Sequence, residues 1–179
     1  MDPTKEIALA TPTGSLPRLE QAIQVAAVAH AGQFRKGTEI PYLVHPVAVA
    51  MMLQRAGCDE DVVIAGLLHD TLEDTSLDAG VIRERFGERV LALVQSCSEP
   101  QKSAPWEDRK RHTLALLESA APDVRLVACA DKLHNIRSIA CDSMNEGEGF
   151  WQRFRRGKES QGWYYRSLVA LLCREPLPE

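Results

Sequence analysis

The segment LLHDTLEDT, at positions 67–75, places one imidazole and three carboxylates at the end of the apolar run VVIAGLL. On a continuous helix His69 and Glu73 would be four residues apart, as would Asp70 and Asp74, so the two pairs would lie side by side on one face. Carboxylates grouped at the edge of a core repel one another and cost on the order of several kcal/mol each when they are desolvated. A bound divalent cation would relieve both problems. The alternative is a solvated helix end, where acidic residues are common, but such an end does not need an imidazole beside an acid.

Two further polar residues interrupt apolar stretches elsewhere in the chain. His45 ends the apolar turn of PYLVHP, and Asp131 follows the apolar stretch VRLVACA. A lone acid in such a stretch is costly unless it is paired or coordinates a metal. Taken singly, His45 has the alternative of a hydrogen-bonded core histidine, and Asp131 that of a salt-bridge partner. Together with His69 and Asp70 they form a set of two imidazoles and two carboxylates, which favours a metal site.

Composition restricts the class of protein. The chain has 179 residues and a net charge of −4, which suits one globular domain and argues against an overall basic surface for duplex nucleic acid. A small negative total still allows a local basic pocket. The start of the chain lacks the layout of a signal peptide, and the longest apolar run, 62–68, is too short to span a bilayer. The five scattered cysteines form no CxxC pair, so we expect reduced thiols in a cytoplasmic protein, without a disulfide or a cysteine-bound zinc.

Helical periodicity dominates the chain, and no strand alternation, repeat or low-complexity tract interrupts it. We expect an all-α fold, a single bundle of six to eight helices over residues 17–179, preceded by a flexible arm over residues 1–16. The breaks fall at the Gly- and Pro-containing segments 32–42 and 98–105 and at 145–149. The predicted helices cover residues 17–30, 46–57, 59–74, 80–97 after an Asp78 cap, 106–120, 122–144 and 150–174.

The order of the polar residues, His45, then His69–Asp70, then Asp131, resembles that of the HD superfamily of metal-dependent phosphohydrolases. The surrounding segments resemble one branch, the alarmone hydrolase domains of the Rel/Spo family and their stand-alone relatives. An HD dipeptide alone is a weak signal, whereas this series of motifs in this order is very specific. The matching stretches cover most of residues 20–140 and are AHAGQFRKG (29–37), PYLVHPVAVA (41–50), AGLLHDTLEDT (65–75), FGERVLALV (86–94) and ADKLHNIR (130–137).

The resemblance implies a single metal ion, typically Mn²⁺, held by His45, His69, Asp70 and Asp131. Ligand type alone also admits other divalent ions. Glu73 and Asp74 match the Glu-Asp pair with which family members orient or deprotonate the attacking water, and which of the two takes the proton stays open.

The resemblance also implies substrate contacts. It places Arg35 and Lys36 near the nucleotide and gives Asn135 a contact to the nucleoside or its phosphate. Lys110, in the DRKR run, aligns loosely with a basic helix near the phosphates. The alternatives are a solvated basic loop for the first pair and a solvated helix face for DRKR. Lys158, with the aromatic residues that follow it, could close over a nucleotide, although those aromatics also suit an ordinary helix core.

These matches together imply a hydrolase-only small alarmone hydrolase. Its reaction would be removal of the 3′-diphosphate of (p)ppGpp or (p)ppApp as pyrophosphate. The alternatives are an HD nucleotidase acting on a 5′-nucleotide or on NADPH, and a catalytically silent nucleotide-binding module. The expected partner is a small nucleotide, without nucleic acid or membrane. Self-association is common in such families, but the sequence carries no diagnostic interface. The preferred base, the number of 5′-phosphates, the native metal and regulation stay open.

Overall fold

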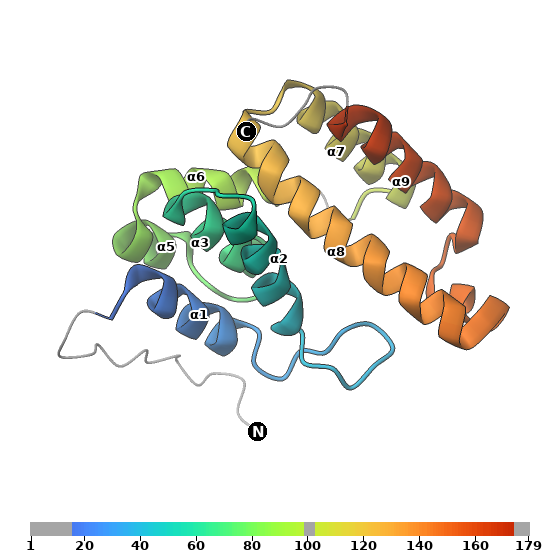
Figure 1. Ribbon diagram of the computed structural model, residues 1–179, viewed down its shortest axis with the longest axis horizontal. Helices are drawn as coiled ribbons and strands as arrows, with labels where there is room; N and C mark the ends of the chain where they lie inside the picture. The colour runs from blue at the N-terminus through green and yellow to red at the C-terminus, as the bar shows by residue number, and fades with distance from the viewer. Residues whose placement is uncertain (1–15, 99–102, 174–179) are drawn as a thin grey trace.

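A computed structural model describes residues 16–98 and 103–173 of the chain, and these residues form an all-α bundle, which confirms the predicted fold class (Figure 1). The predicted arm, apart from Leu16, lies outside the described residues, so the division into arm and domain stays a prediction. The helices are α1 (Arg18–Ala29), α2 (Val44–Arg55), α3 (Glu60–Leu68), α4 (Thr71–Asp74), α5 (Ala79–Phe86), α6 (Glu88–Cys97), α7 (Trp106–Ser119), α8 (Pro122–Glu146), the 3₁₀ helix η1 (Gly147–Arg153) and α9 (Gly157–Leu172).

Helix α3 forms the centre of the larger core. Every residue from Val62 to Leu68 is buried, because the helix is apolar around its whole circumference and packs against α1, α2, α6 and α8. Asp59 caps its start, since its carboxylate accepts a hydrogen bond from the Val62 N–H at 3.1 Å. The polar residues that follow α3 therefore emerge from the middle of the bundle.

Helix α8 runs between two groups of helices (Figure 1). Val127 and Ala130 belong to the core that α8 shares with α1, α2, α3, α5 and α6. Ala128, on another side of the same helix, joins the smaller core that α7 and α9 build around Tyr164 and Leu168. Asp131 lies just beyond these residues, so α8 presents it where the two groups of helices meet.

The predicted helix over residues 59–74 is wrong at its end, because α3 stops at Leu68 and α4 starts at Thr71. Two side chains take the carbonyls that would otherwise continue the helix. The His69 Nδ1 atom lies 2.8 Å from the Gly66 carbonyl oxygen, and the Thr71 hydroxyl donates to the Leu68 carbonyl oxygen at 2.7 Å. His69 and Asp70 thus occupy a turn between two helices.

Two other predicted helices are also shorter than expected. The segment 80–97 divides into α5 and α6 at Gly87, whose φ of +92° favours glycine. The last helix begins at Gly157, because Phe150 belongs to η1 and Phe154 adopts an extended conformation. These breaks leave the all-α class unchanged.

The segment 32–42 forms a compact loop, as expected. Its ends pair, since the Arg35 N–H donates to the Ile40 carbonyl at 2.8 Å and the Tyr42 N–H donates to the Gln33 carbonyl at 2.9 Å. The five cysteines, all within the described ranges, are free thiols, in agreement with the sequence. Among the helices described, none combines the length and the apolar character needed to cross a membrane.

Candidate metal centre

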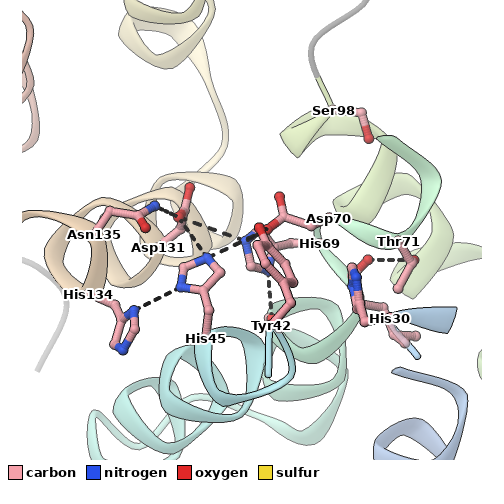
Figure 2. A network of polar contacts seen from close by, with 12 residues as sticks. His30, Tyr42, His45, His69, Asp70, Thr71, Ser98, Asp131, His134 and Asn135 are labelled. Carbon is pink, nitrogen blue, oxygen red and sulfur yellow. Dashed lines mark hydrogen bonds and ion pairs between the residues drawn. The ribbon is translucent and has the colours of Figure 1, made fainter. Parts of the chain in front are cut away.

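Four side chains from α2, the α3–α4 turn and α8 converge on one point (Figure 2). The Nε2 atoms of His45 and His69 and a carboxylate oxygen of Asp131 all lie within 4.8 Å of one another. The Asp70 Oδ2 atom lies 3.5 Å from His45 Nε2 and 3.0 Å from His69 Nε2. The structure therefore brings together the four residues that the sequence predicts as metal ligands.

Burial and hydrogen bonding orient these atoms towards the centre. Both imidazoles are buried, and the Nδ1–H of His69 donates to the Gly66 carbonyl oxygen, which leaves its Nε2 lone pair facing the two carboxylates. That Nε2 atom is buried and makes no well-aligned hydrogen bond among the described residues, although Asp70 Oδ2 lies 3.0 Å away. An orphaned imidazole nitrogen beside two carboxylates fits a divalent cation, because such an ion would bind the lone pair and neutralise the acids.

The charges around His69 also indicate that this position favours a positive charge. Burial by itself would lower the pKa of His69, but the Asp70 and Asp131 carboxylates raise it to about 9. Without a metal, a proton on His69 Nε2 therefore supplies the positive charge that faces the two carboxylates. A divalent ion would replace it.

Neighbouring side chains hold both carboxylates in place. The Tyr42 hydroxyl donates to Asp70 Oδ2 at 2.6 Å, and burial together with the Asp70 charge raises the pKa of Tyr42, so the phenol stays protonated. Asp131 uses its two oxygens differently. Its Oδ2 pairs with the Lys132 ammonium, whereas its Oδ1 accepts from Asn135 Nδ2 at 2.6 Å.

Asn135 also connects the centre to the predicted nucleotide loop. Its Oδ1 accepts a hydrogen bond from Arg35 Nη2 at 2.9 Å, and the Arg35 guanidinium lies 5.8 Å from the centre of the Tyr42 ring. Arg35 and Tyr42 thus approach the two metal-facing carboxylates from the same side.

A cavity of about 420 Å³ opens on this side of the centre. Arg35 and Asn135 line it next to aromatic and aliphatic side chains, which suits a flat base together with a charged group. Its other lining residues are Lys36, Thr38, Ile40, Tyr42, Ser138, Ile139, Cys141, Asp142, Phe150, Arg153, Phe154, Gln161 and Tyr165. We call this cavity the nucleoside pocket, after the ligand that the sequence predicts for this side of the centre.

A second cavity, of about 580 Å³, reaches the centre from the side of α6 and α7. His69, Asp131 and Lys132 line it at the centre, and a mixture of polar and apolar residues from the end of α6, from α7 and from the start of α8 lines the remainder. The candidate metal centre therefore borders this second cavity directly, whereas the first cavity is connected to it through Tyr42 and Asn135.

The chain matches the HD domain family over residues 22–152. It belongs to the HD domain family. The HD domain accounts for the all-α fold and implies a divalent metal, which the cluster at the His-Asp turn could hold.

Several curated proteins and solved structures are similar to this HD domain. A guanosine-3′,5′-bis(diphosphate) 3′-pyrophosphohydrolase of Aquifex aeolicus is 39% identical over 125 residues, which are 68% of this chain and 18% of the relative. The bifunctional (p)ppGpp synthase/hydrolase SpoT of Escherichia coli K12 is 36% identical over 137 residues, which are 72% of this chain and 19% of the relative. The chain thus spans less than a fifth of the length of these curated relatives.

Two solved structures are closer to this HD domain in length. A Listeria monocytogenes protein, lmo0812, superposes with a TM-score of 0.67 at 40% identity, over 72% of this chain and 82% of that chain. A metazoan SpoT ortholog, described as hydrolysing ppGpp and acting in starvation responses, superposes with a TM-score of 0.66 at 25% identity, over 89% of this chain and 97% of that chain.

The other residues predicted for the HD domain site fall into three groups. Arg35, Lys36 and Asn135 line the nucleoside pocket, as described above. Glu73 and Asp74 lie on α4, one turn beyond the ligands, and the Asp74 charge is close enough to Tyr42 to contribute to its raised pKa. The proton-transfer role of this pair stays a prediction.

Lys110 and Lys158 lie farther from the centre than the resemblance implies. The Lys110 ammonium lies 5.2 Å from the centre of the Tyr164 ring, between α7 and α9, and Lys110 does not line the nucleoside pocket. Lys158 pairs with Glu148 at 2.9 Å on the surface and lies over the Trp151 ring. Their substrate contacts therefore stay predictions without support from this arrangement.

Sequence reasoning missed two residues that touch the metal ligands, Tyr42 and Lys132. Both stand inside the matching motifs, Tyr42 three residues before His45 and Lys132 directly after Asp131. A signal was present, because an ionisable residue beside a buried acid is a candidate partner for that acid.

Proposed function

We propose that this HD domain is a divalent-metal-dependent pyrophosphohydrolase that removes the 3′-diphosphate of guanosine 3′,5′-bis(diphosphate) or of its adenosine equivalent. The names of the relatives support the substrate class. The observation that carries the proposal is the hydrogen-bonded series Asp131–Asn135–Arg35, which joins the candidate metal centre to a cationic, aromatic pocket. A nucleotide whose reacting phosphate lies at the centre would thus have its base and sugar in that pocket.

His45, His69, Asp70 and Asp131 would hold the metal ion, and Mn²⁺ suits their mixed imidazole and carboxylate ligands. When bound, such an ion lowers the pKa of a coordinated water and polarises a phosphoryl oxygen. Tyr42 and Lys132 contribute by fixing the two carboxylates, since each contacts an oxygen of one of them.

Glu73 or Asp74 would accept the proton of the attacking water. The water oxygen bonds to the phosphorus next to the ribose, and the bond between that phosphorus and the 3′ oxygen breaks. The 3′ oxygen gains a proton, so the products are pyrophosphate and a nucleoside 5′-diphosphate with a free 3′-hydroxyl.

Arg35 and Asn135 would position the nucleotide. The Arg35 guanidinium is planar, already oriented by Asn135, and close to the Tyr42 ring, so it offers both a stacking surface for a purine and charge for a phosphate.

The test is pyrophosphate release with Mn²⁺ from matched guanosine and adenosine 3′-diphosphate substrates, with a chelator control. We expect release with one or both bases and none with chelator. Orthophosphate alone, or turnover only of 5′-nucleotides or NADPH, would indicate a nucleotidase instead. Binding without turnover of any substrate would indicate a silent nucleotide-binding module.

A further inference from the structure

A third cavity, of about 560 Å³, lies where the start of α7 faces the turn between η1 and α9. Among the described residues that line it, four are cationic and none is acidic. We call these four residues the basic pocket, and they are Lys36, Arg109, Arg155 and Arg156.

The charges of the basic pocket are only partly compensated. The Arg156 Nη2 atom pairs with Glu107 at 3.0 Å, and Lys36 lies 5.2 Å from the centre of the Phe154 ring. Within the described part of the chain, neither Lys36 nor Arg155 has an ion pair. Cations gathered in a concave surface repel one another and create a positive potential, which a bound polyanion lowers.

The basic pocket continues the nucleoside pocket. Both cavities are lined by Lys36, Phe154 and Gln161, so these three residues form the boundary between them. The nucleoside pocket in turn reaches the metal-facing carboxylates through Tyr42 and Asn135. The order along the surface is therefore metal centre, nucleoside pocket and basic pocket.

A nucleotide phosphorylated on both sides of its ribose has the same order of chemical groups. Its 3′-phosphates would lie at the centre, its nucleoside in the middle pocket and its 5′-phosphates at the far end. We propose, on the basis of the proposed function, that the basic pocket binds the 5′-phosphate chain and that affinity rises with the number of 5′-phosphates. Arg155 and Arg156 are its specificity-determining residues.

The experiment measures binding without turnover. Metal-free protein in chelator is titrated calorimetrically with guanosine, GMP, GDP and GTP, none of which carries a 3′-phosphate. We expect affinity to rise at least tenfold from guanosine to GTP. The double variant R155Q/R156Q should lose at least tenfold in GTP affinity while its guanosine affinity stays unchanged.

Two further variants make the test specific. Arg83→Gln removes an exposed arginine that pairs with Glu88 on α5, outside both pockets, and should leave the whole series unchanged. The double variant also loses the Arg156–Glu107 ion pair, which could disturb α7. The single variant Arg155→Gln keeps that pair and removes a side chain that has no ion pair in the described structure, so it should fold normally. It should still lower GTP affinity severalfold.

The outcomes separate this proposal from the proposed reaction. A flat series from guanosine to GTP, or an unchanged series in both Arg155 variants, overturns the phosphate site even if pyrophosphate is released. A rising series that depends on Arg155, together with no pyrophosphate release from any 3′-diphosphate, supports the phosphate site and overturns only the reaction.

Discussion

The imidazoles of His45 and His134 meet through their Nδ1 atoms, which are 2.8 Å apart (Figure 2). Because the Nε2 atom of His45 faces the metal centre, its Nδ1 atom carries the proton and donates a hydrogen bond to His134 Nδ1. Burial and the neighbouring His45 lower the pKa of His134 to about 4, so His134 is neutral and can accept this bond. His134 is thus a positioning residue for a predicted metal ligand.

Replacing His134 with leucine should weaken Mn²⁺ binding by roughly 10- to 100-fold, because the loss of such a partner frees the ligand ring to change tautomer and orientation. Competition with a fluorescent chelator would measure the affinity. Glutamine, which keeps an acceptor, should recover part of the loss. His112→Leu removes an exposed histidine of α7 and serves as the control. Unchanged affinity in His134→Leu would contradict the positioning role.

Substitution of a metal ligand and substitution of Glu73 should affect metal content and turnover differently. Asp70→Ala should abolish both metal content and turnover, since Asp70 Oδ2 lies within 3.5 Å of both imidazole nitrogens. Glu73→Ala should keep the metal and lower kcat by roughly 10²- to 10⁴-fold if Glu73 is the base. Metal analysis and steady-state kinetics measure the two properties, and Glu84→Ala on α5 is the matched control. Full metal content and activity in Asp70→Ala would refute the site.

The stability of the metal-free protein should fall as pH rises from 6.5 to 8.5. Burial would lower the pKa of His69, but Asp70 and Asp131 raise it to about 9, against an ordinary value of 6.5 in the unfolded chain. A raised pKa stabilises the fold fully below pH 6.5, and this contribution is lost as pH rises towards 9. Urea unfolding in chelator measures the trend.

The same pH series has two controls. His69→Gln should flatten it, because no imidazole titrates at that position. Saturating Mn²⁺ should also remove the decline, because the ion replaces the proton at Nε2. A metal-free protein whose stability is constant, or rises, over this range would show that the charge at His69 does not contribute in this way.

Gly66 sets the distance between α2, which carries His45, and α3, which leads into the turn with His69. A Cβ atom at this position would overlap Leu53 Cδ1 and crowd Val49 Cγ1, both on α2 and both buried. Gly66→Val should therefore lower the free energy of unfolding by about 1–3 kcal/mol. It should also weaken metal binding, because α2 carries His45. Ala92→Val, at an exposed position of α6, is the control, and equal effects of the two changes would contradict this packing account.

Much of the site could be predicted from the sequence, because its polar side chains stand in apolar segments where burying them costs free energy. His69 and Asp70 follow seven buried residues, and Asp131 follows an apolar stretch of α8, so burying these polar groups is costly unless partners compensate them. Periodicity likewise determined the all-α class. The ends of helices were less predictable, because the break at His69 depends on side chains competing for backbone carbonyls.

The tertiary structure alone decided which neighbours complete the site. His45 and His134 are 89 residues apart in sequence, and Arg35 and Asn135 are 100 apart, so periodicity along the chain carries no information about either pair. The basic pocket likewise depends on tertiary structure, because Lys36, Arg109 and Arg155 look like solvated charges until folding brings the loop 32–42, the start of α7 and the turn before α9 together. The sequence by itself determined the types of ligand and the helices that carry them. Only the packing of those helices decided which charges face one another. Electrostatic energy depends on distance through space and on burial, and the separation of two residues along the chain gives neither.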